Sequence, residues 1–233
     1  MMEQTVKQTE KQAEKQAERQ TAEGTNFASL SCKEFCRVLA SREPVPGGGG
    51  ASALAGALAA ALGNMVGNLT VGKKKYAAVE AEIIACNERA EKLRERFLQL
   101  IEDDAACFAP LAAVYRLPGA TAEEKEEKAA RLEEALLEAC RVPAQIMECC
   151  LEALELIAVY EEKGSVMALS DAAAAALLAG SALTAASLNI RINARSMADR
   201  HKAEEITACM EERIQKGTAR ADEIYRRAVA RLS

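Results

Sequence analysis

The chain has 233 residues, of which 50% are hydrophobic but only 3% are aromatic, with no tryptophan. This length suits a single domain with a sizeable core, and a core built from Ala, Leu, Val, Ile and Met favours closely packed helices over a β-sandwich. The formal net charge of −5 argues against a nucleic-acid-binding protein, which normally carries a basic excess.

The N-terminal segment, residues 1–24, is of low complexity and consists mainly of Gln, Lys, Glu, Thr and Ala. It has helix propensity but almost no large apolar side chains to bury, so we expect a charged extension outside the folded domain. The domain itself then covers residues 25–233. Because the segment also lacks the apolar run of a signal peptide, we expect a cytoplasmic protein.

Prolines and glycines dominate the next part of the chain. Ser31 has capping-box spacing to Glu34 and predicts a short helix that ends near Ala40. The run from Pro44 to Gly50 then precedes an alanine-rich helix, predicted from Ala51 to about Thr70. A glycine loop that opens a helix leaves free N–H groups at the positive end of the helix dipole, which is a typical anion site. The structural alternative is a sharp turn into a buried helix.

Four longer helices are predicted in the remainder of the chain. They cover about Tyr76 to Tyr115, Thr121 to Glu162, Val166 to Ser196 and Asp199 to Arg231. Pro110 and Pro143 are expected to bend the first two of them. No segment shows the sustained alternation of a strand. The predicted fold is all-α, an up-and-down bundle of about six helices with long, partly kinked helices.

Two stretches carry no charged residue, Gly47–Gly72 and Ala172–Ile190. Each is long enough to span a bilayer. Their composition is mostly Ala, Gly, Ser and Thr rather than the Leu, Ile and Phe that drive membrane insertion. We therefore expect them to form the buried centre of a soluble bundle and expect no membrane association.

Asp104 is the first candidate for chemistry. It lies in an apolar helical stretch, with Leu100 one turn before it and Phe108 one turn after. Burial raises the pKa of a carboxyl group and makes it a possible proton shuttle near neutral pH. The alternative is a structural ion pair, and Glu102 and Asp103 are expected to be its solvated neighbours.

A second set of polar residues lies on the helix predicted from Val166. Asp171, Asn189 and Asn193 fall on one stripe of that helix, because Asn189 follows Asp171 by five turns. Buried polar groups need partners, and a ligand is one candidate. The alternative for Asp171 is a stabilising role in the first turn of its helix. Lys73, Lys74 and Lys75 are either a solvated basic turn or an anion-binding cluster.

Metal binding is not expected. The eight cysteines include no Cys-x-x-Cys pair, and His201 is the only histidine of the chain. A zinc site of the ordinary kind therefore lacks ligands.

Several motifs together resemble the cyclodeaminase/cyclohydrolase family of folate one-carbon enzymes. The family includes the C-terminal half of formiminotransferase-cyclodeaminase and the stand-alone methenyltetrahydrofolate cyclohydrolases. The matching segments span about residues 28 to 200 and are Pro44–Gly49, Met65–Tyr76, Asp104–Phe108, Val142-Pro143, Ser170-Asp171 and Asn189–Asn193. The family's acidic run Asp-Glu-Asp-Ala appears here as Glu102-Asp103-Asp104-Ala105. Only Asp104 and Ala105 of that run carry over.

The resemblance implies a 5-formimidoyltetrahydrofolate cyclodeaminase that forms 5,10-methenyltetrahydrofolate and ammonia, or a 5,10-methenyltetrahydrofolate cyclohydrolase that acts on the same intermediate. It implies a homodimer with sites in a groove near the subunit interface, and no metal or cofactor beyond the tetrahydrofolate substrate. The implied catalytic residues are Asp104 and Asp171, and the implied substrate-binding residues are Gly47, Gly48, Gly49, Lys73, Lys74, Lys75, Asn189 and Asn193. The lysines suit a folate tail, polyglutamylated or not. A hypothesis from another class is a non-catalytic helical adaptor.

Overall fold

The computed structural model describes residues 26–232, and this part of the chain contains six α-helices, three short 3₁₀ helices and no strand. The predicted all-α bundle is confirmed. The predicted extension, residues 1–24, lies outside the described residues, so the domain boundary stays a prediction.

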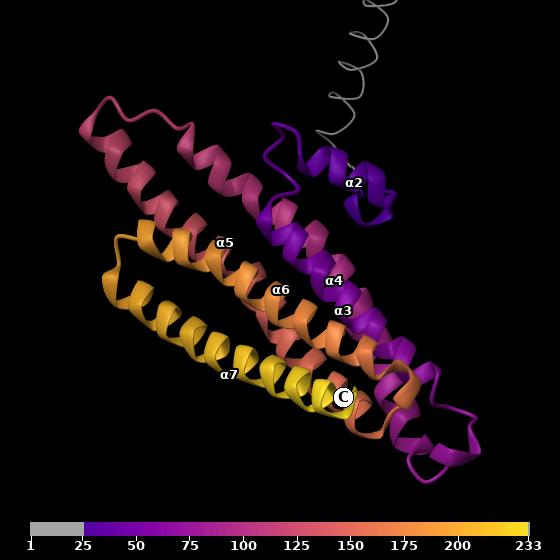
Figure 1. Ribbon diagram of the computed structural model, residues 1–233. Helices are drawn as coiled ribbons and strands as arrows, with labels where there is room; N and C mark the ends of the chain where they lie inside the picture. Colours follow the sequence, from indigo (N-terminus) through magenta and orange to yellow (C-terminus); the bar gives the residue numbers. More distant parts are fainter. Residues whose placement is uncertain (1–25, 233) are drawn as a thin grey trace, which may run out of the picture.

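The long helices form two layers (Figure 1). One layer holds α3 (Gly48–Asn68), α6 (Leu169–Ser196) and α7 (Arg200–Leu232), with α6 in the middle. The other layer holds α4 (Glu80–Tyr115) and α5 (Ala122–Lys163), which packs against every other long helix. The elements that remain are short: α2 (Cys32–Leu39), η1 (Phe27–Ser29), η2 (Lys74–Tyr76) and η3 (Val166–Ala168).

Local sequence signals explain where two of the helices, α2 and α5, begin. The Ser31 side chain accepts a hydrogen bond from the Glu34 N–H at the start of α2. Thr121 and Glu124 form a reciprocal capping box at the start of α5. Both α4 and α5 continue through their internal prolines, Pro110 and Pro143.

The start of α3 differs from the prediction. Gly48, Gly49 and Gly50 form its first turn and Gly47 is its N-cap, whereas a loop up to Gly50 was expected. Among the described glycines only Gly72 has a positive φ, so the glycines before and within α3 are not needed for an unusual backbone conformation. Their role is close approach. A Cβ on Gly56 would lie 2.3 Å from Cε1 of Phe97, so α3 packs with its backbone against the aromatic ring of α4.

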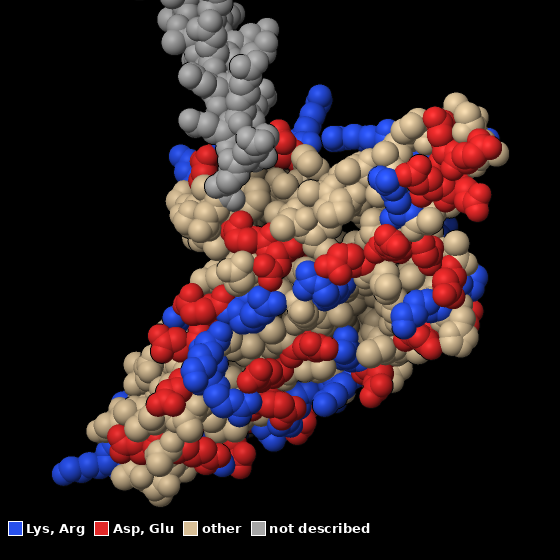
Figure 2. Space-filling view, turned by 180° about the vertical axis from the view of Figure 1, so that it is seen from behind, with Lys and Arg blue, Asp and Glu red and all other residues tan. Residues whose placement is uncertain are grey.

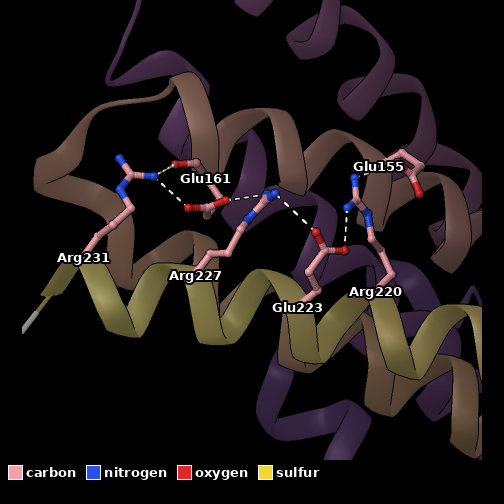
Figure 3. Close-up of polar contacts among 6 residues, drawn as sticks. All are labelled: Glu155, Glu161, Arg220, Glu223, Arg227 and Arg231. Atoms are coloured by element: carbon pink, nitrogen blue, oxygen red, sulfur yellow. Dashed lines mark hydrogen bonds and ion pairs between the residues drawn. The ribbon is translucent and has the colours of Figure 1, made fainter.

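A chain of ion pairs joins α7 to α5 (Figure 3). The Glu161 side chain is only 2% exposed and lies 2.6 Å from Arg227 and 2.7 Å from Arg231. Arg227 continues the chain to Glu223 of α7. Because Glu161 is buried, its carboxylate depends on the two arginines to compensate its charge. Breaking these pairs should therefore destabilise the folded protein far more than breaking one of the exposed ion pairs nearby.

The two charge-free stretches form α3 and most of α6. Both helical segments, Gly48–Asn68 and Val166–Ser196, are long and apolar enough to cross a membrane by length and composition alone. In each, 56% of the most apolar window is buried against the rest of the bundle. Such burial is typical of core helices in a soluble protein. The remaining surface of these two helices is mixed: it exposes large apolar side chains such as Leu58 and Leu188 together with polar ones such as Thr184 and Arg191.

Candidate active site

A cavity of about 360 Å³ opens at the N-terminal end of α3. The cavity lies where the first turn of α3 meets the second half of α4, the middle of α5 and the last turns of α6. Its lining combines the glycine segment, one carboxylate, two amides and an apolar wall: Pro44, Val45, Gly47, Gly48, Gly49, Asp104, Cys107, Phe108, Leu111, Tyr115, Ala139, Pro143, Asn189, Ile192, Asn193 and Ser196.

Asp104 of α4 lies directly against the first turn of α3. The Gly50 N–H donates a hydrogen bond of 2.9 Å to its Oδ2. A Cβ on Gly49 would lie 2.0 Å from Oδ1 of Asp104, so this approach is open only to glycine. The predicted anion site at the start of α3 is thus occupied, at least at Gly50, by the protein's own carboxylate.

The environment of Asp104 favours its neutral form more than water does. Burial raises the pKa of the carboxyl group, and the hydrogen bond from Gly50 opposes part of that rise. A carboxyl group with a raised pKa that borders a cavity is suited to accept and return a proton near neutral pH. The predicted partial burial of Asp104 is confirmed.

The two amides come from consecutive turns of α6. Asn189 lies beside the first turn of α3, because a Cβ on Gly48 would be 3.8 Å from its Nδ2. No protein hydrogen bond to the Asn189 side chain is found within residues 26–232, which leaves its donor and acceptor for a ligand. Asn193 donates a hydrogen bond of 3.1 Å to the Ala139 carbonyl of α5, and this bond orients its amide.

The apolar wall was not identified from the sequence. Phe108, Leu111 and Tyr115 follow Asp104 at helical spacing and line the same cavity. That spacing was the signal that could have located them. Cys107 also lines the cavity, where its thiol donates to the Glu138 carbonyl and burial raises its pKa. A thiol held in its neutral form is a poor nucleophile, so Cys107 contributes to the wall and not to covalent chemistry.

The other predicted site residues lie at the opposite end of the bundle. Asp171 and Asn189 do share a face of α6, but five turns separate them by about 27 Å. Lys73, Lys74 and Lys75 follow the C-terminal end of α3, about 30 Å or more from the glycines that begin it. Within one chain the structure therefore does not bring Asp171 or the three lysines to the cavity beside Asp104, and their roles in the site stay predictions. Helical periodicity gives the face of a residue but not its distance along the axis.

Local contacts explain several of these polar residues. Lys73 donates a hydrogen bond of 3.3 Å to the Ser165 hydroxyl, and the Lys75 ammonium lies 5.4 Å from the centroid of the Tyr76 ring. Glu102 accepts a hydrogen bond from the Ala28 N–H at 2.8 Å. Asp103 pairs with Arg96 at 2.9 Å. Glu102 and Asp103 thus hold neighbouring parts of the chain and do not line the cavity.

No group of three or more His, Cys, Asp or Glu residues in the described part of the chain is placed to hold a metal ion. Cys140 and Cys150, two of the buried cysteines, lie among apolar side chains of the core.

Comparison with known proteins gives a consistent result. The sequence model of the family described as formiminotransferase-cyclodeaminase matches residues 31–212. A methenyltetrahydrofolate cyclohydrolase of Methylorubrum extorquens is 41% identical over 187 residues, which are 80% of this chain and 90% of that protein. The formimidoyltransferase-cyclodeaminase of Rattus norvegicus is 27% identical over 169 residues, 72% of this chain but only 31% of that longer protein.

A solved structure agrees with the fold. The crystal structure of a formiminotetrahydrofolate cyclodeaminase from Thermotoga maritima matches with a TM-score of 0.73 and 30% sequence identity. The match covers 88% of this chain and 96% of that one.

Proposed function

The chain belongs to the formiminotransferase-cyclodeaminase family, and we propose that it is a folate one-carbon enzyme acting at the bridge between N5 and N10 of tetrahydrofolate. The first candidate reaction is the cyclodeamination of 5-formimidoyltetrahydrofolate to 5,10-methenyltetrahydrofolate and ammonia. The second is the hydrolysis of 5,10-methenyltetrahydrofolate, which the similarity to a bacterial cyclohydrolase favours. The observation that carries both is the half-buried Asp104 carboxyl at the rim of a ligand-sized cavity.

In cyclodeamination, N10 attacks the carbon of the protonated, positively charged formimidoyl group and forms the new C–N bond. The Asp104 carboxylate accepts the proton that N10 loses, and the resulting acid returns a proton to the departing nitrogen, which leaves as ammonia. The product is a cation whose charge is spread over N5, carbon and N10. An ionised Asp104 beside it stabilises that charge.

Cyclohydrolysis begins from the same cation. Asp104 accepts a proton from the water that attacks the bridging carbon, and it returns this proton to N5 as the bond between N5 and that carbon breaks. The hydroxyl group on the carbon loses its own proton to solvent and becomes the carbonyl oxygen of the 10-formyl product. The unpartnered amide of Asn189 and the anchored amide of Asn193 are placed to orient the polar edge of the substrate. The wall formed by Phe108, Leu111 and Tyr115 suits its flat ring system.

The related proteins are named as enzymes, which argues against the non-catalytic adaptor. We further propose that the chain is a soluble, cytoplasmic homodimer that binds a tetrahydrofolate derivative and requires no metal or other cofactor. The negative net charge supports a protein that does not bind nucleic acid.

The test uses the purified full chain with 5-formimidoyltetrahydrofolate and, separately, with 5,10-methenyltetrahydrofolate. Gain of methenyl absorbance with stoichiometric release of ammonia identifies the cyclodeaminase. Loss of methenyl absorbance without ammonia, faster than the uncatalysed reaction, identifies the cyclohydrolase. If neither substrate is turned over and tetrahydrofolate does not bind, the proposal is wrong and the result favours the non-catalytic helical adaptor.

A further inference from the structure

Pro143 interrupts the backbone hydrogen bonding of α5 at the wall of the cavity. It is buried inside this helix and lines the cavity, but it has no role in the chemistry proposed for Asp104. A proline has no N–H to donate, and its ring presses against the carbonyl group four residues earlier. In α5 that carbonyl belongs to Ala139, which also lines the cavity. Pro143 therefore removes one bond of the helix and displaces the acceptor that this bond would have held.

The freed carbonyl does not lie on the solvated side of the bundle. Charged side chains cover the face that is seen in Figure 2. On α5 itself, Glu138 and Arg141 form an exposed ion pair at 2.6 Å. Ala139 and Pro143, in contrast, are both buried. A buried carbonyl group that loses its helical partner needs another donor, because leaving it without one is costly.

Asn193 of α6 supplies that donor. Its Nδ2 donates a hydrogen bond of 3.1 Å to the Ala139 carbonyl, which is an ordinary length for such a bond. The next residue of α5 contacts the same amide: burial, together with Cys107, raises the pKa of Cys140 to about 11, and a hydrogen bond with Asn193 opposes part of that rise. The nitrogen of the amide thus points to α5. Both donors of an amide are on its nitrogen, so Oδ1 of Asn193 is the atom left for a ligand, and it can only accept.

The turn of α5 before Pro143 also contacts the helix that carries Asp104. The Cys107 thiol of α4 donates to the Glu138 carbonyl at 3.1 Å, and Cys107 follows Asp104 by three residues on the same side of α4. The acceptor of Asn193 and the carboxyl group of Asp104 are therefore both held against one turn of α5. This arrangement fixes their relative position across the cavity.

Pro110 of α4 provides a comparison within the same chain. The carbonyl that it frees belongs to Ala106, and both residues are exposed, so water can hydrate this acceptor. Neither residue lines the cavity. A proline inside a long helix is thus not sufficient for the arrangement seen at Pro143; the burial of Ala139 and the neighbouring amide are needed as well.

We propose that Pro143 is a positioning residue for the reaction: it frees the Ala139 carbonyl to hold the amide of Asn193, so that Oδ1 of Asn193 accepts a hydrogen bond from an N–H edge of the ligand. The tetrahydropterin ring of a folate carries such donors in its amino group and its ring N–H groups. An amide that was free to turn over would present donor and acceptor alternately and would lose this selectivity. The inference rests on the proposed function for its ligand, but not for the link between Pro143 and Asn193.

The first experiment follows the Asn193 amide by NMR and needs no folate. Asparagine is isotope-labelled, and the side-chain signal of Asn193 is assigned by its loss in Asn193→Ala. Its N–H protons should exchange with water at least about tenfold more slowly than those of Asn189, the other amide at the cavity. Pro143→Ala should speed this exchange to the level of Asn189, whereas Pro110→Ala should leave it slow. Equal exchange of the two amides in the wild type overturns the proposal.

The second experiment measures the coupling of the two positions by urea unfolding. Asn193→Ala leaves the Ala139 carbonyl without its side-chain donor, and Pro143→Ala then returns an N–H to the helix that can reach it. Pro143→Ala should therefore lower the unfolding equilibrium constant at least about fivefold more in the Asn193→Ala protein than in the wild type. The comparison cancels the higher helix propensity of alanine, which is common to both proteins.

Pro110→Ala is the matched control for this coupling, and its effect should be the same in the two proteins. Equal effects of Pro143→Ala in the two proteins would mean that the Ala139 carbonyl does not depend on Asn193, which overturns the proposal.

The third experiment tests what the oriented oxygen does for the ligand. With the substrate that is turned over, Pro143→Ala should raise KM at least about fivefold and change kcat less than about threefold, because Asp104 is left in place. In the Asn193→Ala protein the same substitution should leave KM unchanged. An unchanged KM in Pro143→Ala, or an equal rise in both proteins, would show that Pro143 does not act on the ligand through Asn193 and overturns the proposal. If neither substrate is turned over, the proposed reaction is wrong, and the first two experiments still decide the link between Pro143 and Asn193.

Discussion

Replacement of Asp104 by Asn separates the chemistry proposed for this carboxyl group from its contribution to the fold. Asn is nearly isosteric, and its side-chain oxygen can still accept the 2.9 Å hydrogen bond from the Gly50 N–H. Loss of a group that transfers protons lowers rates by about 10²- to 10⁴-fold. We therefore expect kcat to fall within this range while KM changes far less, because the cavity keeps its shape.

The same substitution is expected to have little effect on stability at neutral pH. Burial raises the pKa of Asp104 above its ordinary value of 3.8, so the folded state disfavours the ionised form. This unfavourable contribution is absent at low pH and grows as the pH rises from the unfolded pKa through the folded one. Asn removes it, whereas the weaker hydrogen bond of a neutral acceptor costs about 1 kcal/mol. The two effects oppose each other, so the free energy of unfolding at pH 7 should change by less than about 1 kcal/mol.

The measurements are steady-state turnover between about pH 5 and pH 9 and urea unfolding at the same pH values. In the wild type, the acidic limb of kcat/KM should lie above the ordinary aspartate range, and it should vanish in the variant. Asp103→Asn is the matched control, because Asp103 lies one residue away but pairs with Arg96 and does not line the cavity. Turnover of Asp104→Asn within about threefold of the wild type would refute the reasoning.

Two further substitutions test contacts described above. Gly49→Ala should reduce turnover nearly as much as Asp104→Asn, because its Cβ would lie 2.0 Å from the carboxylate oxygen; Gly48→Ala, whose Cβ would meet Asn189 at 3.8 Å, should keep most of its activity. Equal turnover of the two alanine variants would show that the approach to Asp104 is not required. Glu161→Gln should lower the free energy of unfolding by about 3 kcal/mol in urea, since it leaves two arginines facing a neutral amide. Glu155→Gln, at an exposed position of the same chain of ion pairs, should cost less than about 1 kcal/mol, and similar losses for both would contradict the importance of burial.

The helices and their boundaries could largely be predicted from the sequence because their signals are local. Ser31 and the Thr121–Glu124 capping box act within a single turn, and the apolar periodicity of α4 records which side faces the core. Asp104 was found in the same way, as a lone carboxylate on an apolar face. The glycine helix start was missed because the contact that holds Gly50 in the first turn of α3 comes from Asp104, on another helix.

The arrangement of the site could not be predicted to the same depth. The motifs that contain Asp104, Asn189 and the segment Lys73–Tyr76 occur one after another along the chain, but their separation in space depends on where each lies along its helix. Asn189 and Asp104 line the same cavity because α6 runs antiparallel to α3 and ends at its start. Asp171 lies at the far end for the same reason. Side-chain periodicity contains no information on this axial position.

The contact of Gly56 with the Phe97 ring bears on how sequences of this fold can diverge. A smaller side chain at position 97 leaves a cavity that the bundle can tolerate at a cost, whereas any side chain at position 56 collides with the ring. Substitutions at the two positions must therefore occur in a fixed order: a smaller residue has to replace Phe97 before a larger residue can replace Gly56. Among related chains, larger residues at position 56 should occur only together with smaller ones at position 97.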